Sequence, residues 1–176
     1  MNLKEIKKVT TDLQGEIYLV GGVIRDYCLG TDLKDIDFVV SGPTKQVAIN
    51  FAEKMNGSFV ILDEKRDMYR VVTTNLVYDF SSLAGNNIEE DLQRRDFTIN
   101  AIALKSCRAD NPIGNWIDPL EGLKDIKKGK IKVVGDNSFK DDPLRILRMV
   151  RFRAQFGFAI EKVTKQLARK SVSKLT

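Results

Sequence analysis

The sequence contains no histidine, and only two of its 176 residues are cysteine and four are proline. The absence of histidine excludes Ser-His-Asp and Cys-His catalysis and every zinc site that needs an imidazole ligand. Cys28 and Cys107 are too few for an all-cysteine zinc site or a disulfide framework. Any chemistry must therefore rest on carboxylates, arginine, lysine, hydroxyl groups and a metal ion held by oxygen.

Long apolar runs are also missing. No stretch approaches the roughly 20 apolar residues of a membrane-spanning helix, and the first ten residues lack the apolar centre of a signal peptide. With 43% hydrophobic and 30% charged residues, the composition is that of a soluble protein with a real core. We therefore expect a cytoplasmic location, with both cysteines reduced and no membrane partner.

The charge balance is mildly basic, with 29 Lys and Arg against 24 Asp and Glu, a net charge of +5. A small excess of base points only weakly toward a polyanion as partner. The distribution is more informative, because arginines gather at Arg94-Arg95 and again over residues 145–153.

The hydrophobic pattern predicts strands followed by helices. Strands are expected over 17–20, 35–40, 59–62, 68–73, 76–80 and 131–134, and helices over 23–29, 44–55, from 142 onward and over 161–174. Residues 98–104 fit a helix or a strand by periodicity, and their position after the RRDF segment favours a helix. Thr44 is the expected N-cap of the second helix, and Asp142 caps a helix that has Pro143 at its first position. This order predicts an α+β catalytic domain over residues 1–135 and the beginning of an all-helical domain over 136–176.

The first candidate site is Gly21-Gly22 with Arg25 and Asp26. A strand that ends in two glycines and leads into a helix presents bare backbone N–H groups at a helix N-terminus, and such groups bind phosphate oxygens. Arg25 would add a charged donor. Taken alone, the motif fits a simple strand-to-helix turn better, with Arg25 and Asp26 paired on the surface.

The second candidate site consists of Asp35, Asp37 and Asp79. Residues two apart on a strand point to the same face, so Asp35 and Asp37 repel each other by about 4 kcal/mol at ~4 Å and an effective dielectric constant near 20. A divalent cation relieves this repulsion, and oxygen ligands favour Mg²⁺ or Mn²⁺. Asp79 lies on a later strand, and three carboxylates can hold two metal ions. The alternatives are an exposed strand face with Lys34 as counter-charge, and a strand-end Asp79 that accepts backbone bonds.

Two further motifs combine arginine with acids. Arg94, Arg95, Asp96 and Asn100 have the spacing to bind a triphosphate and a sugar hydroxyl, although a charged helix start capped by Asp96 is the commoner reason for such a pattern.

Asp142 and Arg145 share a helix face with Arg148 next along it. A carboxylate that accepts from an exocyclic amino group, beside an arginine that donates to a ring nitrogen, fits cytosine and adenine and rejects uracil and guanine. The alternative is a helix cap with an ion pair three residues apart.

Together and in this order, the motifs resemble those of the class II tRNA nucleotidyltransferase and bacterial poly(A) polymerase family. The matching segments are LVGGVIRD (19–26), KDIDFVV (34–40), YDFSSL (78–83), EEDLQRRDFTINAIA (89–103), IDPLEGLKDI (117–126) and DDPLRILRMVRFRAQFGF (141–158). They cover nearly the whole chain from residue 17 to 158.

This resemblance implies a polymerase-β-like nucleotidyltransferase head with a mixed sheet and flanking helices, followed by the start of a helical neck. It implies a two-metal site on Asp35, Asp37 and Asp79, with Mg²⁺ or Mn²⁺. The implied nucleotide-binding residues are Gly21, Gly22, Arg25, Asp26, Arg94, Arg95, Asp96, Asn100, Asp142, Arg145 and Arg148. Asp118 and residues 122–125 match a hinge-like motif. The implied reaction is template-independent transfer of CMP or AMP, or both, from CTP and ATP to the 3′ end of tRNA, with release of pyrophosphate.

Two departures from the family pattern leave the product open. Ala84 stands where the family often has arginine, and the segment between Asp79 and Asp91 is short beside members with an extended loop linked to addition of the final A. Addition of CCA, of CC only and of A only are all compatible. Two further alternatives are a poly(A) polymerase that uses ATP and a non-catalytic nucleotide- or RNA-binding module. Because the chain ends within the expected neck, we expect further domains or a second polypeptide to supply tRNA binding.

Overall fold

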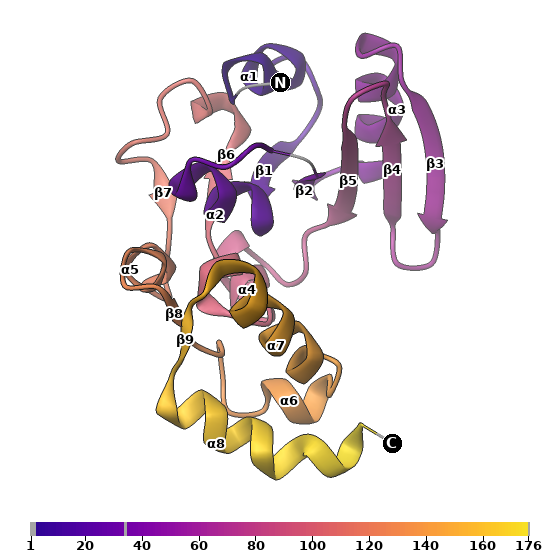
Figure 1. Ribbon diagram of the computed structural model, residues 1–176. Helices are drawn as coiled ribbons and strands as arrows, with labels where there is room; N and C mark the ends of the chain where they lie inside the picture. The colour runs from indigo at the N-terminus through magenta and orange to yellow at the C-terminus, as the bar shows by residue number, and fades with distance from the viewer. Residues whose placement is uncertain (1–2, 34, 176) are drawn as a thin grey trace.

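The computed structural model describes residues 3–33 and 35–175, and its strands and helices are shown in Figure 1. The strands are β1 (Glu16–Val20), β2 (Asp35–Ser41), β3 (Ser58–Asp63), β4 (Met68–Val72), β5 (Val77–Ser82), β6 (Ala103–Lys105), β7 (Trp116–Ile117), β8 (Lys130–Ile131) and β9 (Ala159–Ile160). The α-helices are α1 (Leu3–Thr10), α2 (Gly22–Leu29), α3 (Thr44–Lys54), α4 (Ile88–Gln93), α5 (Gly122–Lys127), α6 (Ser138–Asp141), α7 (Arg145–Phe156) and α8 (Lys162–Ser171). Short 3-10 helices occupy Thr98–Asn100, Ser106–Arg108 and Val172–Lys174.

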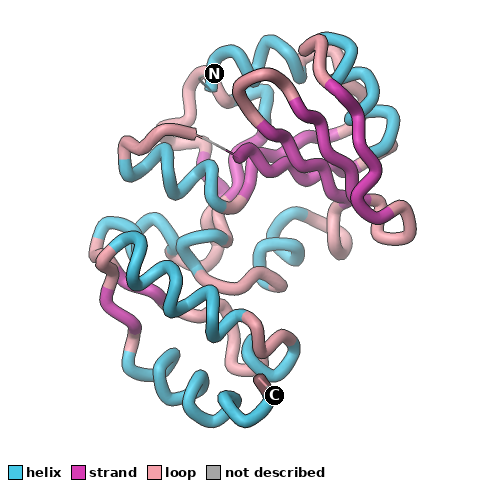
Figure 2. Tube along the Cα trace, turned by 45° about the vertical axis from the view of Figure 1, so that its right-hand side comes forward, coloured by secondary structure: helices cyan, strands magenta, loops and turns pink. Residues whose placement is uncertain are grey.

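Seven strands form one mixed sheet in the order β3-β4-β5-β2-β1-β6-β7. Only the central pair β2 and β5 is parallel, and the other neighbours are antiparallel. A parallel pair needs a crossover connection, and the segment from α3 through β3 and β4 provides it. The prediction of an α+β fold with a mixed sheet is confirmed, and the strands of this large sheet gather at one end of the molecule in Figure 2.

The strand alternation gives the sheet two different faces. Ile36 and Phe38 of β2 enter the main core, where Phe51 of α3 packs against Phe38 with ring centroids 5.7 Å apart. The intervening positions face the other way, where Val39 joins a smaller cluster with Leu92 of the short helix α4. Because side chains alternate along a strand, Asp35 and Asp37 share the face that α4 covers only in part. This leaves space above the acids.

Helices α6 to α8 follow the sheet region and form the other end of the molecule (Figures 1 and 2). They are connected to it in two ways. β8 pairs in parallel with β9, and the core that contains Phe97 continues into Phe139 and Phe152. The ring centroids of Phe97 and Phe152 lie 5.8 Å apart in an edge-on arrangement. These contacts fix α7 against the sheet region.

Most expected strands are present, within one or two residues at their ends, but the expected helix over 98–104 is wrong. The structure has a 3-10 turn at Thr98–Asn100 and then strand β6, which pairs with β1. A short, fully apolar run fits a buried strand as well as a helix by periodicity, and pairing with β1 decides the outcome here. The expected strand over 131–134 is reduced to β8 and a single bridge between Val133 and Phe97.

Both expected caps differ in detail. Pro43, not Thr44, is the N-cap residue of α3, because its carbonyl accepts the first helical bond from Val47. Asp142 accepts from the backbone N–H of Leu144 (3.0 Å), but this bond lies in the turn before the helix. Leu144 is the N-cap residue of α7, which begins at Arg145. The sequence patterns did not predict helices α1, α4, α5 and α6. In the described part of the chain, no helix has both the length and the apolar character needed to cross a membrane.

Candidate active site

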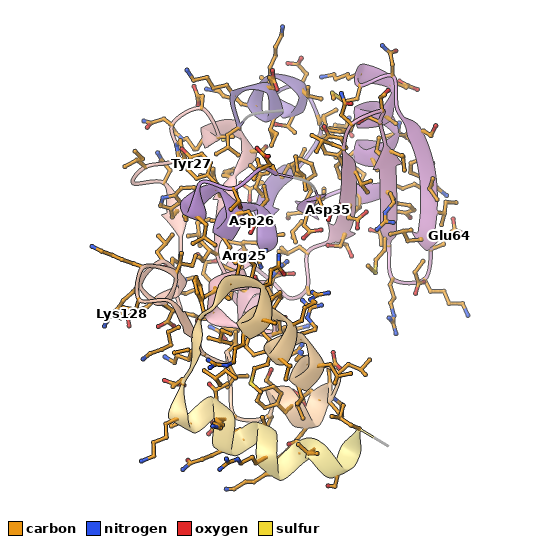
Figure 3. All side chains as sticks on the ribbon, viewed as in Figure 1. Arg25, Asp26, Tyr27, Asp35, Glu64 and Lys128 are labelled. Atoms are coloured by element: carbon orange, nitrogen blue, oxygen red, sulfur yellow. The ribbon has the colours of Figure 1, made fainter. Side chains whose placement is uncertain are left out.

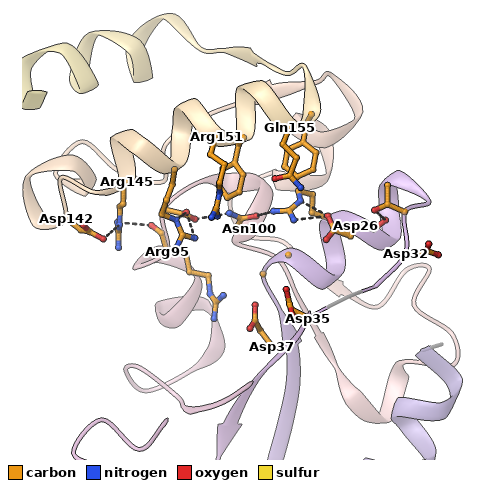
Figure 4. Close-up of a pocket in the computed structure, with 18 of the residues that line it drawn as sticks. Asp26, Asp32, Asp35, Asp37, Arg95, Asn100, Asp142, Arg145, Arg151 and Gln155 are labelled. Atoms are coloured by element: carbon orange, nitrogen blue, oxygen red, sulfur yellow. Dashed lines mark hydrogen bonds and ion pairs between the residues drawn. The ribbon is translucent and has the colours of Figure 1, made fainter. Parts of the chain in front are cut away.

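A cleft of about 1010 Å³ lies between α7 and the region where β1, α2 and β2 meet (Figure 4). Its lining includes Gly21, Gly22, Arg25, Asp26, Asp32, Asp35, Asp37, Arg95, Asp96, Asn100, Asp142, Arg145, Arg148, Arg151, Phe152, Gln155 and Phe156. Small-molecule sites commonly measure about 300–1,000 Å³, so this cleft has room for a large polar ligand. Twelve of the fourteen predicted site residues line it; Arg94 and Asp79 do not.

Both sides of the cleft carry charge: Arg145, Arg148 and Arg151 stand with Asp142 on the α7 side, and Asp35 and Asp37 stand near Arg95 on the other. Figure 4 shows Arg145 and Arg151 on α7, facing Asp35 and Asp37 across the opening. A ligand with negative phosphates and a metal ion would find complementary charges on both sides.

The three predicted acids lie close together on two adjacent strands. Asp37 of β2 is directly opposite Asp79 of β5 in the parallel register, and Asp35 lies two residues before Asp37. Burial raises the pKa of the Asp37 carboxyl, and the negative charge of Asp79 raises it further. Arg95 has a smaller, opposing effect. The alternative in which Lys34 neutralises one charge concerns a residue outside the described part of the chain.

Asp79 has a partner that sequence reasoning missed. Arg70 of β4 lies opposite it in the antiparallel register. Its Nε donates to Oδ1 of Asp79 (2.7 Å) and its Nη2 donates to Oδ2 (2.8 Å). As the side chains stand, no group of three acidic or cysteine side chains among the described residues is close enough to share one metal ion. The only signal for Arg70 was its position on the strand before Asp79.

The glycine turn contributes space and bare backbone. Gly21 has φ +72° and precedes the first residue of α2, Gly22. A Cβ at Gly21 would lie 3.2 Å from Nη1 of Arg95 and 3.3 Å from Oδ2 of Asp37. A side chain here would therefore intrude between the phosphate-binding candidates and the acids, which is consistent with a phosphate site at this turn.

Arg25 is buried and its polar atoms are engaged. Its Nε donates to Oδ1 of Asp26 (2.8 Å) and its Nη1 to Oδ1 of Asn100 (2.6 Å). The guanidinium lies over the ring of Phe156 on α7, 4.5 Å from the centroid. Figure 3 shows Arg25 on the side of α2 that faces α7. The predicted pair with Asp26 exists, but it is partly buried rather than on the surface, and the contact of Arg25 with Phe156 connects α2 to α7.

Asn100 and Asp96 extend this chain of bonds to α7. Asn100 Nδ2 donates to Oδ1 of Asp96 (3.1 Å), and Arg148 Nε donates to Oδ2 of Asp96 (2.7 Å). The bonds therefore run without a gap from Asp26 through Arg25, Asn100 and Asp96 to Arg148 (Figure 4). This network spans three elements that are distant in sequence.

The two arginines before Asp96 have different environments. Arg94 is exposed, whereas Arg95 donates to Oδ2 of Asp91 from its Nε (3.1 Å) and Nη2 (2.9 Å). Its Nη1 lies near Gly21 and Asp37. Arg95 is therefore placed to meet a ligand above the acids, and Arg94 contributes its backbone carbonyl to another contact.

Asp142 and Arg145 are neighbours as predicted, with Arg145 Nε 3.7 Å from Oδ2 of Asp142. Arg145 also donates to the backbone carbonyls of Arg94 (2.8 Å) and Arg95 (3.1 Å) and to Oγ of Ser138 (2.6 Å). These contacts are an ion pair and structural hydrogen bonds to the 94–95 backbone and Ser138. Base selection by the two residues stays a prediction.

The hinge-like motif consists of close structural contacts. Asp118 accepts from the backbone N–H groups of Gly122 (2.6 Å) and Leu123 (2.9 Å), and Asp125 accepts from Thr98 Oγ1 (2.7 Å). A Cβ on Gly122 would lie 2.1 Å from the carbonyl oxygen of Thr98. The motif therefore holds α5 tightly against the turn that carries Asn100.

The segment between β5 and α4, residues 83–87, is short and is held by hydrogen bonds. Ala84 N–H donates to Oδ1 of Asp91 (3.2 Å), and Asn86 N–H donates to Oε2 of Glu90 (2.9 Å). Asn87 caps α4 by accepting from Glu90 N–H. No side chain at position 84 reaches toward the cleft, because alanine has only a methyl group.

Sequence reasoning also missed the far end of the cleft, formed by Arg151, Phe152, Gln155 and Phe156 of α7 and Asp32 before β2. Arg151 stands three residues after Arg148, as Arg148 stands three after Arg145. That helical spacing was the signal that would have extended the prediction along α7.

The chain matches the family model described as Poly A polymerase head domain over residues 17–132. It is 39% identical over 153 residues to the CC-adding tRNA nucleotidyltransferase of Synechocystis sp., covering 86% of this chain and 36% of the relative. It is 36% identical over 157 residues to the A-adding tRNA nucleotidyltransferase of Deinococcus radiodurans, covering 89% and 34%.

A solved tRNA nucleotidyltransferase complexed with a primer tRNA and an incoming ATP analog superposes with a TM-score of 0.82 at 32% identity, covering 96% of this chain and 50% of that one. The chain thus spans about one third to one half of the length of these proteins. The family match covers about two thirds of the chain and includes both glycines and all three acids, so the chain belongs to the poly A polymerase head domain family.

Proposed function

We propose that this chain carries the nucleotidyl-transfer step of a tRNA-processing enzyme: it transfers CMP or AMP, or both, from CTP and ATP to the 3′ end of tRNA. The observation that supports this most is the pair of Asp35 and Asp37, which lines the cleft beside the Gly21-Gly22 turn and across from the arginines of α7, with Asp79 directly opposite Asp37 on β5. We place the activity in the cytoplasm.

Nucleotidyltransferases use divalent metal ions, and the donor set here fits Mg²⁺, with Mn²⁺ as a substitute. All three candidate ligands are carboxylates, and Gly21 leaves the space beside Asp37 free of a side chain. Burial and, after it, the charge of Asp79 raise the pKa of Asp37, and a bound cation would offset both effects. When bound, the metal ions would stabilise the negative charge on the phosphates and on the attacking oxygen.

The chain's own residues position the reactants. The Gly21-Gly22 amides and Arg95 bind the triphosphate, and Asp79 accepts the proton of the RNA 3′-hydroxyl. The hydroxyl oxygen then forms a bond to the α-phosphorus as the bond to pyrophosphate breaks. Residues 1–135 form the catalytic head in this proposal, and 136–176 begin the neck that selects the nucleotide.

The test is incorporation of labelled CMP and AMP onto tRNA that lacks its 3′ end, with Mg²⁺ and with EDTA. We expect extension that needs the metal. Because these relatives are about two to three times as long, we propose that the rest of a longer protein or a second polypeptide supplies most of the tRNA affinity. Long homopolymer tails from ATP alone would instead identify a poly(A) polymerase, and metal-dependent nucleotide binding without transfer would identify a binding module.

The short segment after β5 favours CC addition among the three tRNA products. It is held by Asp91, Glu90 and Asn87, and an extended loop is the feature that the family resemblance connects with the final A. We expect CTP alone to add two nucleotides and ATP to add nothing further. Full CCA ends formed with both nucleotides would overturn this choice.

Base selection belongs to Asp142 and Arg145 in this proposal. Arg145→Ala removes the donor for cytosine N3, so we expect the variant to lose its preference for CTP over UTP. The ratio of kcat/KM for the two nucleotides measures this. An unchanged ratio would limit Arg145 to its structural contacts with Ser138 and the 94–95 backbone.

A further inference from the structure

Arg70, Asp79 and Asp37 form a row across three adjacent strands. Arg70 of β4 is directly opposite Asp79 of β5, and Asp79 is directly opposite Asp37 of β2. Neighbouring strands lie about 4.8 Å apart, so Arg70 stands roughly 10 Å from β2. Asp79 is between the positive charge and the other two acids.

The contact between Arg70 and Asp79 is specific in geometry. Each carboxylate oxygen accepts one N–H, at 2.7 Å and 2.8 Å. A fork of two parallel bonds fixes both the position and the plane of the carboxylate, which one bond does not. A carboxylate has about four lone-pair directions, so a free one remains on each oxygen.

Arg70 is not one of the described residues that line the cleft, so as placed it does not touch a bound nucleotide. Without Arg70, the Asp79 carboxylate would lose the two hydrogen bonds that fix its plane, while the negative charges of Asp35 and Asp37 would still repel it. The charges of all three acids raise the pKa of Arg70, with Asp79 as the main cause, so Arg70 stays charged.

We propose that Arg70 is a positioning residue for the transfer reaction: it holds the Asp79 carboxylate beside Asp37, so that Asp79 joins Asp35 and Asp37 in binding a divalent cation. The inference rests on the proposed function for its effect on catalysis. Partners of metal-binding side chains typically contribute about 10- to 100-fold in metal affinity or activity. The competing view is a cross-strand ion pair that only adds stability.

The test compares Arg70→Ala, Arg70→Lys and the control Arg66→Ala. Arg66 lies in the same β3–β4 hairpin and pairs loosely with Asp63, with Nε 3.6 Å from Oδ2, and its side chain is 79% exposed. We expect Arg70→Ala to lower kcat by about 10-fold or more and to leave KM for CTP within about twofold. Arg70→Lys, with one donor in place of a fork, should recover part of the rate. Arg66→Ala should match the parent chain.

A second readout needs no catalysis. Mn²⁺ binding is measured by electron paramagnetic resonance on the folded chain, for Arg70→Ala, Asp79→Asn and the double variant. We expect Arg70→Ala to weaken Mn²⁺ binding about 10-fold, and the double variant to bind no more weakly than Asp79→Asn alone, because Arg70 acts through Asp79.

The outcomes separate the two proposals. If the parent chain transfers no nucleotide, the proposed function fails. The comparison of Mn²⁺ binding among the two single variants and the double variant still decides the role of Arg70. Unchanged or tighter Mn²⁺ binding by Arg70→Ala overturns the positioning role, since tighter binding means that Arg70 competes with the metal. Additive losses in the double variant also overturn it, because they show a general structural effect.

Discussion

At the scale of single residues, the sheet's alternation places acidic side chains where a core would not accept them. Asp37 lies between Ile36 and Phe38, which are buried on the opposite face. Its carboxyl is desolvated and stands beside Asp79, and both effects raise its pKa. The metal-free protein therefore loses stability at this position, and a bound cation would recover it.

Replacing Asp37 by asparagine should stabilise the metal-free chain while it abolishes transfer. A carboxyl with a raised folded-state pKa favours folding when protonated, so the wild type loses stability as pH rises from the unfolded-state pKa through the folded-state pKa. Above that window the gain from Asp37→Asn is complete, and we expect a melting temperature higher by about 1–3 °C at pH 7. Thermal unfolding in EDTA at pH 4 and pH 7 measures it. A variant that melts lower than the wild type at pH 7 would contradict the loss of stability assigned to the ionised Asp37 carboxylate.

Gly21 and Gly114 offer a matched pair of substitutions. Both have positive φ, but a Cβ at Gly21 meets Arg95 and Asp37, while a Cβ at Gly114, which does not line the cleft, meets nothing within 4 Å. Gly21→Ala should cost about 1–3 kcal/mol and also reduce transfer, because the new methyl group fills the site. Gly114→Ala should cost roughly 1–2 kcal/mol with transfer unchanged. Equal kinetic effects in the two variants would remove Gly21 from the site.

At the scale of elements, α7 is fixed over the sheet by polar and aromatic contacts together. Arg25 of α2 reaches Asn100 in the 3-10 turn, and Asp96 reaches Arg148 of α7. Phe152, also on α7, packs edge-on against Phe97. These contacts keep the arginines of α7 at a constant distance from the acids, as a site that binds a charged ligand between two elements requires.

Asn100→Ala should break this network at its centre. The substitution removes the acceptor of Arg25 Nη1 and a donor to Asp96 in a buried place, so we expect unfolding free energy to fall by about 2–3 kcal/mol. Urea unfolding measures it. The control Asn115→Ala removes an amide that donates only to the carbonyl of Asn111 and should change stability by less than about 0.5 kcal/mol. Similar losses in the two variants would show that the network contributes little.

Strands β1 to β5 and helices α2, α3, α7 and α8 were predictable because period-two and helical patterns are local properties of a sequence. The same alternation places Asp35 and Asp37 of β2 on one face, but the pairing of Asp37 with Asp79 of β5 depends on register between strands. Arg70 could not be found, since its role depends on the register between β4 and β5, which the sequence does not state. The burial of Arg25 was likewise unpredictable, because it depends on Phe156 arriving from a helix 130 residues later.

At the scale of the whole molecule, the net positive charge lies at one end. Residues 136–176 contain ten Lys and Arg against four Asp and Glu, a net of +6, while residues 1–135 have a net of −1. On α8, Lys162, Lys165, Arg169 and Lys170 are exposed, and none of them forms an ion pair with another described residue. A polyanion would therefore bind at this end.

Lys162→Ala with Lys165→Ala should weaken RNA binding and reduce its salt dependence. Each phosphate that the protein no longer neutralises lowers the slope of log K against log salt by about 0.7–0.9, so we expect a decrease of about 1–2. Fluorescence anisotropy with tRNA between 50 and 200 mM salt tests this, within the range over which such electrostatic binding dominates. The control is Lys45→Ala with Lys124→Ala, two lysines already paired with Glu64 and Glu121. If the slope of log K against log salt changes only in the control variant, the RNA does not bind at α8.

The central claim is that Asp35 and Asp37 carry a metal-dependent nucleotidyl transfer. Its most direct test is single-turnover transfer of labelled CMP to tRNA lacking its 3′ end, in Mg²⁺, by the parent chain and by Asp35→Ala with Asp37→Ala at matched folded fraction. We predict product from the parent chain and a rate lower by about 10³-fold or more in the variant, the loss expected when the groups that stabilise transition-state charge are removed. Transfer at the parent rate by the double variant would contradict the account.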